Sequence, residues 1–219
     1  MISLEEKKLQ GHKHKLLAFE KRRAQISGTK NVNVNYNVFA FCQIPAFKHG
    51  DNIVNESAAA CLYLEFKSQG NKLIPDTAAE QAVMYQRMME GLTLTEKLNS
   101  TIYYEWFIPE QERHESAVRR NREALTAELK LWEGYLQNFP PFGLCIQVAA
   151  GSYLAGAFSL ADVIVFPNIA CALRFGPSVE RYPKLAKYYS LLKDRPSIKN
   201  TWPPHWLPSP QGYDTLKNI

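Results

Sequence analysis

A capping box followed by a nearly uniform apolar run is the feature that most constrains the fold of this chain. Ser159 and Asp162 have the spacing in which a hydroxyl accepts from the amide three residues on while the carboxylate accepts from the cap amide. Phe158 precedes the box, where a hydrophobic staple would close onto Val163. The segment 163–174 carries one charge and is apolar nearly all round, which is typical of a helix enclosed by others. We read these residues as structural, and they predict the core helix of a bundle.

Further helical patterns surround this core helix in the second half of the sequence. They cover residues 78–105, 113–138 and 183–194, and a short final helix is predicted at 210–217. A core stripe runs along the second of them, formed by Leu125, Leu129, Trp132 and Leu136. The predicted domain is therefore all-α and spans residues 75–219.

The first part of the sequence reads as an α/β unit. Residues 1–10 resemble the end of a helix that stops at Gly11, and residues 32–38 alternate apolar and polar positions as a half-buried strand does. Residues 44–54 predict a hairpin whose turn is 49–52. A helix is expected at 56–66, with Ala59, Leu62 and Tyr63 facing the core. We therefore expect a domain at residues 1–74, joined by a linker at Pro75 to Thr77.

Composition excludes several classes of function. The net charge of +5 is modest, and its densest cluster, at Arg119, Arg120 and Arg122, is answered by nearby glutamates, so a solvated helix face is favoured over a nucleic-acid site. Neither a membrane span nor a signal peptide is visible, which predicts a cytoplasmic protein. The four cysteines and five histidines lack metal-ligand spacing, so no metal is expected.

Three blocks of the sequence, taken together, resemble a known family. Phe158 to Asp162, Glu180 to Leu185 and Arg195 to Ile198 resemble the helical domain of the cytosolic glutathione transferases, and Trp202 to Trp206 is similar to the ending of the rho class. The resemblance runs from Ile2 to the C-terminus with breaks. It implies a thioredoxin-like domain before the helical bundle, glutathione as co-substrate, small hydrophobic electrophiles as partners, and a homodimer.

The resemblance also implies which residues bind glutathione. Ile44 would pair its backbone with the cysteinyl part, a cis Pro45 would set the geometry, and Gln43 would offer its amide. Glu56 would answer the α-ammonium group of the ligand, while Ser57 and the helix start would receive its carboxylate. Two alternatives remain open: an edge-strand proline at Pro45, and an ordinary helix start capped by Asn55 or Ser57.

An electrophile pocket is expected between the domains. By resemblance it would be lined by the first long helix of the bundle, with Phe166, Trp202 and Trp206 as weaker candidates. The alternative is that a helical methionine stripe belongs to the core or to a dimer contact. The helix residues proposed for this pocket are Tyr85, Met88, Met89 and Leu92.

No catalytic residue can be assigned from the sequence. In the family, a hydroxyl or thiol before the first helix activates the glutathione sulfur, and its equivalent is expected to lie before Met1. Ser3 would sit inside the helix and is not taken as a substitute. Loss of the first strand would destabilise the domain unless residues 32–41 fill its place, and Cys42 offers an alternative thiol chemistry. Segments 31–42 and 139–150 depart from the family pattern.

Two functions are therefore carried forward. The first is a glutathione transferase that conjugates glutathione to hydrophobic electrophiles in detoxification. The alternative is a non-catalytic protein of the same fold, which binds glutathione or another ligand without activating the thiol.

Overall fold

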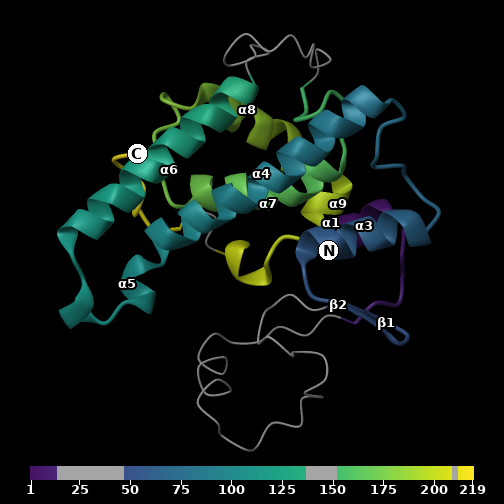
Figure 1. The fold of residues 1–219 in the computed structure, drawn as a ribbon, viewed down its shortest axis with the longest axis horizontal. Helices are drawn as coiled ribbons and strands as arrows, with labels where there is room; N and C mark the ends of the chain where they lie inside the picture. Colours follow the sequence, from purple (N-terminus) through teal and green to yellow (C-terminus); the bar gives the residue numbers. More distant parts are fainter. Residues whose placement is uncertain (14–46, 137–151, 209–211) are drawn as a thin grey trace, which may run out of the picture.

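The chain forms a helical bundle with a small hairpin beside it (Figure 1). The structure is a computed structural model that describes residues 1–13, 47–136, 152–208 and 212–219. The helices and strands in chain order are α1 (Ile2–Glu6), β1 (Phe47–His49), β2 (Asn52–Val54), α3 (Ser57–Lys67), α4 (Ala78–Ile102), α5 (Tyr104–Phe107), η2 (Glu110–Glu112), α6 (Glu115–Tyr135), α7 (Leu160–Arg174), α8 (Pro183–Leu192), α9 (Pro196–Lys199) and η3 (Pro204–Trp206).

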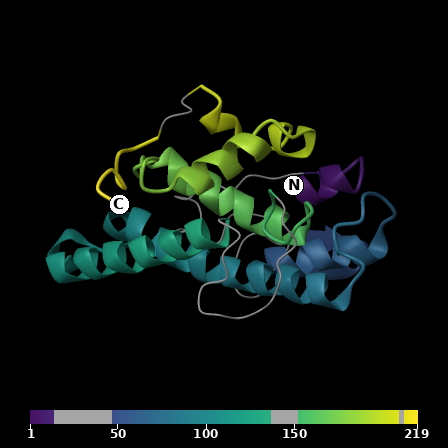
Figure 2. The ribbon, with the colours of Figure 1, turned by 90° about the horizontal axis from the view of Figure 1, so that it is seen from above.

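Helix α7 is the centre of the bundle. Figure 2 shows it between α8 on one side and α4 with α6 on the other. The side chains of Phe166, Ile169, Leu125 and Trp132 are fully buried here. A helix that is apolar on every side is stable only when it is enclosed in this way, so the sequence prediction of a core helix is confirmed.

The predicted capping box is present at the start of α7. The Ser159 amide donates to Asp162 Oδ2 at 2.9 Å, and Asp162 Oδ1 accepts from the Leu154 amide at 3.1 Å and from the Tyr188 hydroxyl at 2.8 Å. Asp162 therefore joins the start of α7 to the preceding loop and to α8. Phe158 contacts Arg195, whose guanidinium lies 3.7 Å from the centre of the Phe158 ring.

The N-terminal helix is shorter than the sequence predicted. Helix α1 ends at Glu6, and Lys8 follows with a φ of 54° in the left-handed region. Gly11 also has a positive φ, of 76°, but it lies beyond the helix end, so the prediction that it stops the helix is wrong. Helix α1 packs against α3 and α9, and this docking sets the end of the helix ahead of Gly11.

The hairpin has the predicted antiparallel form. Phe47 pairs with Val54, and Gly50 in the turn takes a φ of 60° that suits a residue without Cβ. In α3, however, the buried side chain is Leu64, while Leu62 and Tyr63 are half-buried and Ala59 is exposed. The prediction of Ala59 as a core residue is wrong, because α3 meets the bundle along the side that carries Leu64.

The long helices lie close to their predicted ranges, with corrections at the ends. Helix α4 ends at Ile102 and the short α5 follows, while α6 ends at Tyr135, so Leu136 is a half-buried cap residue. No helix forms over the described residues 212–219, which correct the predicted helix at 210–217: this tail is anchored instead by the buried side chains of Leu216 and Ile219. The predicted strand at 32–38, the segment 32–41 and the divergent block 139–150 lie outside the described residues.

The described residues contain neither a membrane-spanning helix nor a cluster of metal-ligating side chains. None of the helices in that part of the chain combines the length and apolar character needed to cross a bilayer. Nor do three histidine, cysteine, aspartate or glutamate side chains gather there into a group that could hold a metal ion.

Candidate functional site

A cavity of about 520 Å³ lies where α1, α3, α4 and α7 meet the segment that follows α9. Its walls come from both predicted domains. The starts of α1 and α3 form one side, and the bundle with Trp202 and Trp206 forms the other. A concave site that joins an apolar wall to a few polar groups is the usual form of a small-molecule site.

The start of α3 is the polar end of this cavity. Glu56 is the N-cap residue, with extended backbone angles, and its side chain makes no capping hydrogen bond. The first bond within the helix runs from the Ala60 amide to the Glu56 carbonyl, so the amides before Ala60 lie ahead of the helical ladder. Glu56 and Ser57 are both exposed and both line the cavity. The alternative in which Asn55 or Ser57 caps the helix is therefore wrong.

The opposite end of the cavity is aromatic. Phe166 stacks on Tyr189 with ring centres 5.9 Å apart and planes 9° from parallel, and Trp202 lies 5.9 Å from Phe166. Trp206 follows at 5.8 Å from Trp202. These rings offer a broad flat surface to an apolar ligand.

The structure divides the residues predicted for the electrophile pocket into two groups. Leu92 and Phe166 line the cavity, as do Trp202 and Trp206. Tyr85, Met88 and Met89 are not among the lining residues: Met88 is completely buried in the core, and Met89 is half exposed on the surface of α4. The four positions have the i, i+3, i+4, i+7 spacing of one helix face. Along that face Met88 packs into the bundle core, and only Leu92 of the four lines the cavity.

Of the residues predicted to bind glutathione, the structure brings Glu56 and Ser57 together at the cavity. Gln43, Ile44 and Pro45 lie outside the described residues, as does Cys42. Their roles stay predictions.

Cys61 also lines the cavity, one turn along α3 from Ser57. Burial raises the pKa of its thiol, which outweighs the opposite effects of the Met1 ammonium group and the Ser3 hydroxyl beside it. The thiol is therefore protonated near neutral pH, and a protonated thiol is a poor nucleophile. We assign Cys61 to the wall of the cavity and give it no role in the chemistry.

Several polar lining residues were not predicted from the sequence. They are Thr95 on α4, Asn168 on α7 and Thr201 after α9. Nothing in their spacing brings them together, because they come from three separate segments. Pro167 was visible as a proline inside a predicted helix, and it also lines this cavity.

A second hollow, of about 660 Å³, lies along the outside of α6 beside Asn218 and Ile219. Its lining includes Arg119 and Arg122 with Glu115 and Glu123. Arg119 is exposed, in agreement with the predicted solvated face. The positive and negative side chains of this second hollow lie together on one open surface of α6. The first cavity is enclosed by several segments, so we place the candidate site there, between α3 and α7.

Known proteins similar to this chain agree with this geometry. The family model described as "Glutathione S-transferase, C-terminal domain" matches residues 95–201. Glutathione S-transferase A of Pleuronectes platessa is 56% identical over 222 residues, which cover 100% of this chain and 92% of that protein. Among solved structures, a glutathione S-transferase from the Antarctic clam Laternula elliptica has a TM-score of 0.78 and 29% identity, covering 100% of this chain and 92% of the other.

A more distant structure shows the same fold. The glutathione transferase URE2P6 of Phanerochaete chrysosporium, in complex with oxidized glutathione, has a TM-score of 0.70 and 23% identity. The match covers 92% of this chain and 87% of the other.

Proposed function

We propose that this chain, which belongs to the glutathione S-transferase family, conjugates glutathione to hydrophobic electrophiles at the cavity between α3 and α7. Membership follows from the 56% identity with a curated relative along the whole chain. The observation that carries the proposal is one continuous cavity that joins the open start of α3 to the aromatic wall of Phe166, Trp202 and Trp206.

The polar end suits the γ-glutamyl part of glutathione. The free amides and partial positive charge at the start of an α-helix attract a carboxylate, and the Ser57 hydroxyl can donate to the same group. Glu56 supplies a negative charge for the neighbouring α-ammonium group. In our proposal, Gln43, Ile44 and Pro45 hold the cysteinyl part, as the family resemblance implies.

The aromatic end suits an apolar electrophile. Leu92 and Phe166 would contact its body, and Trp202 and Trp206 would cover it. Binding both partners in one cavity places the glutathione sulfur beside the electrophilic carbon, which replaces a chance encounter by a fixed approach. The glutathione thiol gives up its proton and its sulfur forms the new bond to the electrophilic carbon. In a substitution the leaving group departs with its bonding electrons, and in an addition to an activated double bond the second carbon takes up a proton.

We also propose a homodimer with a cytoplasmic role in detoxification, on the strength of the family. Phe66, near the end of α3, is 76% exposed and serves as the position at which we probe a dimer contact. Light scattering after gel filtration, with Phe66→Glu beside the natural chain, tests it. A monomeric natural chain would contradict this part of the proposal.

The experiment that tests the function is titration calorimetry with glutathione beside a turnover assay with chlorodinitrobenzene. We expect Glu56→Gln and Ser57→Ala each to weaken glutathione binding by about ten- to a hundredfold, the usual effect of losing a hydrogen bond to a charged group. Glu110→Gln, in the exposed and distant η2, is the control and should change neither measurement.

Each outcome separates the two candidate functions. Binding with turnover supports the transferase. Binding without turnover supports the alternative of a non-catalytic glutathione-binding protein. Neither binding nor turnover would overturn both.

A further inference from the structure

The bundle side of the cavity has an unusual distribution of hydrogen-bonding groups. Its hydroxyls already donate to backbone carbonyls: Thr95 to Gly91 at 2.8 Å, and Thr201 to Ser197 at 2.8 Å. The Trp202 indole N–H donates to the Lys193 carbonyl at 3.3 Å. These three donors are used within the protein, while both hydroxyl oxygens keep lone pairs that can accept.

Asn168 adds to the same pattern. Its amide nitrogen donates to the Ile164 carbonyl at 3.2 Å, an orientation that turns Oδ1 to the other side of the side chain. Because Asn168 lines the cavity, its oxygen adds a further acceptor to this wall.

Pro167 contributes an acceptor from the backbone. It stands inside α7 and has no N–H, so the helical hydrogen bond that would end on the Val163 carbonyl cannot form. In an α-helix the carbonyl of residue i points along the helix toward residue i+4, so the Val163 carbonyl points toward Pro167. Val163, Ile164 and Pro167 all line the cavity, which places the carbonyl on the cavity side of α7.

We propose that this cavity selects electrophiles that carry a hydrogen-bond donor, an N–H or O–H group, on an apolar body. The inference rests on the proposed function and specifies its second substrate. A donor on the ligand would pair with the acceptors of Thr95, Val163 and Asn168. A ligand of the same shape that carries only acceptors would displace water from these protein acceptors without pairing with them. Leaving them unpaired would weaken its binding.

The test uses two unreactive probes of equal shape, N-butyl-3-nitrobenzamide and butyl 3-nitrobenzoate. They differ by one group, an amide N–H in place of an ester oxygen. Quenching of tryptophan fluorescence reports their binding, because Trp202 and Trp206 line the cavity. Neither probe reacts, so the result does not depend on catalysis.

We expect the amide to bind about three- to tenfold more tightly than the ester, the effect of one hydrogen bond. Pro167→Ala restores an N–H that pairs with the Val163 carbonyl, so it should reduce this ratio toward one. Thr95→Val removes a second acceptor and should reduce the ratio in the same direction. Pro183→Ala is the matched control, since Pro183 is the first residue of α8 and lies away from the cavity lining.

Three results would overturn the inference: equal binding of amide and ester, ratios unchanged in both cavity variants, or no quenching by either probe. The chlorodinitrobenzene assay and glutathione titration are run on the same preparations. Absence of glutathione conjugation with the amide preference intact would reject the proposed function, while the preference of the cavity for ligands with a hydrogen-bond donor would stand.

Discussion

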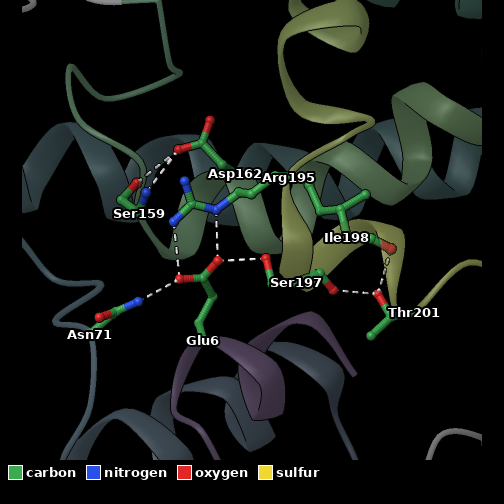
Figure 3. Close-up of polar contacts among 8 residues, drawn as sticks. All are labelled: Glu6, Asn71, Ser159, Asp162, Arg195, Ser197, Ile198 and Thr201. Atoms are coloured by element: carbon green, nitrogen blue, oxygen red, sulfur yellow. Dashed lines mark hydrogen bonds and ion pairs between the residues drawn. The ribbon is translucent and has the colours of Figure 1, made fainter.

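Glu6 on α1 binds Arg195 at the start of α9, with its carboxylate oxygens 2.6 and 3.0 Å from two guanidinium nitrogens, although 189 residues separate them. Figure 3 shows Ser197 and Asn71 donating to the same carboxylate. The pair therefore ties the N-terminal helix to the far end of the chain and stands close to the capping box of α7.

We expect Glu6→Ala to lower the free energy of unfolding by about 2–3 kcal/mol, below the full cost of breaking a buried ion pair because Arg195 is partly exposed and can be hydrated. Urea denaturation at pH 7 measures the change. Glu5→Ala is the control on the same helix, because within the described residues the Glu5 carboxylate accepts a single long hydrogen bond, from Asn200 at 3.4 Å. Equal losses for the two variants would contradict the special role of Glu6.

The pH dependence of stability should carry a signature of Asp162. Burial raises the pKa of this carboxyl to about 6 from 3.8, in spite of the hydrogen bonds that it accepts from Leu154, Ser159 and Tyr188. The folded state therefore binds the proton more tightly than the unfolded state, so the free energy of unfolding falls as pH rises from about 4 to about 7 and levels off above the folded pKa. The same linkage predicts that Asp162 reduces stability by about 1 kcal/mol between pH 5 and pH 7.

Asp162→Asn removes this titration. Between pH 5 and pH 7 we expect the free energy of unfolding of the natural chain to fall by about 1 kcal/mol relative to that of the variant. Urea midpoints at pH 5, 6 and 7 give the curve. Parallel pH profiles would show that Asp162 does not titrate in this window. Glu6 acts in the opposite direction at lower pH: burial raises its pKa, but hydrogen bonds from Arg195, Ser197 and Asn71 outweigh burial and lower it.

The start of α8 is capped by a residue of another helix. The two carboxylate oxygens of Glu133 on α6 accept from the Lys184 amide at 2.7 Å and the Leu185 amide at 2.9 Å. Glu133→Gln leaves one acceptor for two amides, and we expect a loss of about 1–2 kcal/mol.

Hydrogen exchange locates the effect of Glu133→Gln. The Lys184 and Leu185 amides should exchange faster in the variant, while amides within α4 keep their protection. Glu123→Gln, on the exposed side of the same helix, should leave both rates unchanged. Unchanged exchange at Lys184 and Leu185 in the Glu133 variant would show that the cap contributes little.

Local patterns predicted the elements of this fold well. The capping box at Ser159 and Asp162 depends on four consecutive residues, and the enclosed character of α7 is visible in its apolar run. The errors lie at the ends of elements and in α3. There, contacts with the rest of the fold determine where a helix ends and which of its side chains are buried. Gly11 has the positive φ of a helix stop, yet α1 ends five residues earlier, and α3 turns Leu64 inward where Ala59 was expected.

The candidate site was only partly visible in the sequence. Glu56 and Ser57 are neighbours, so a short motif could indicate them, and Phe166 and Leu92 followed from the family resemblance. Thr95, Asn168 and Thr201 meet at the cavity only because three helical segments converge there. The external cap of α8 by Glu133 has the same origin, because the two helices are brought together by the fold and no local spacing relates them.

The contact between α4 and α7 yields a prediction with a matched control in another helix. A Cβ on Gly91 would lie 2.9 Å from Cγ2 of Val165, closer than carbon atoms approach. A Cβ on Gly134 in α6 would meet no atom of the described residues within 4 Å. We expect Gly91→Ala to lower the free energy of unfolding by about 1–3 kcal/mol through overpacking. Gly134→Ala should raise it by about 0.5–1 kcal/mol, since alanine suits a helix better than glycine.

Val165→Ala removes the atom that Gly91→Ala would meet, so the double variant identifies the cause. If the clash is the reason, the double variant should be more stable than the sum of the two single changes predicts, with a coupling of about 1 kcal/mol or more in urea denaturation. If the losses of unfolding free energy in the two single variants simply add in the double variant, the clash with Val165 is not the cause. Gly91 would then be required for the backbone conformation of α4. Because Thr95 donates to the Gly91 carbonyl at the cavity wall, a shift of α4 in Gly91→Ala should also weaken ligand binding, and the Val165→Ala background should restore it.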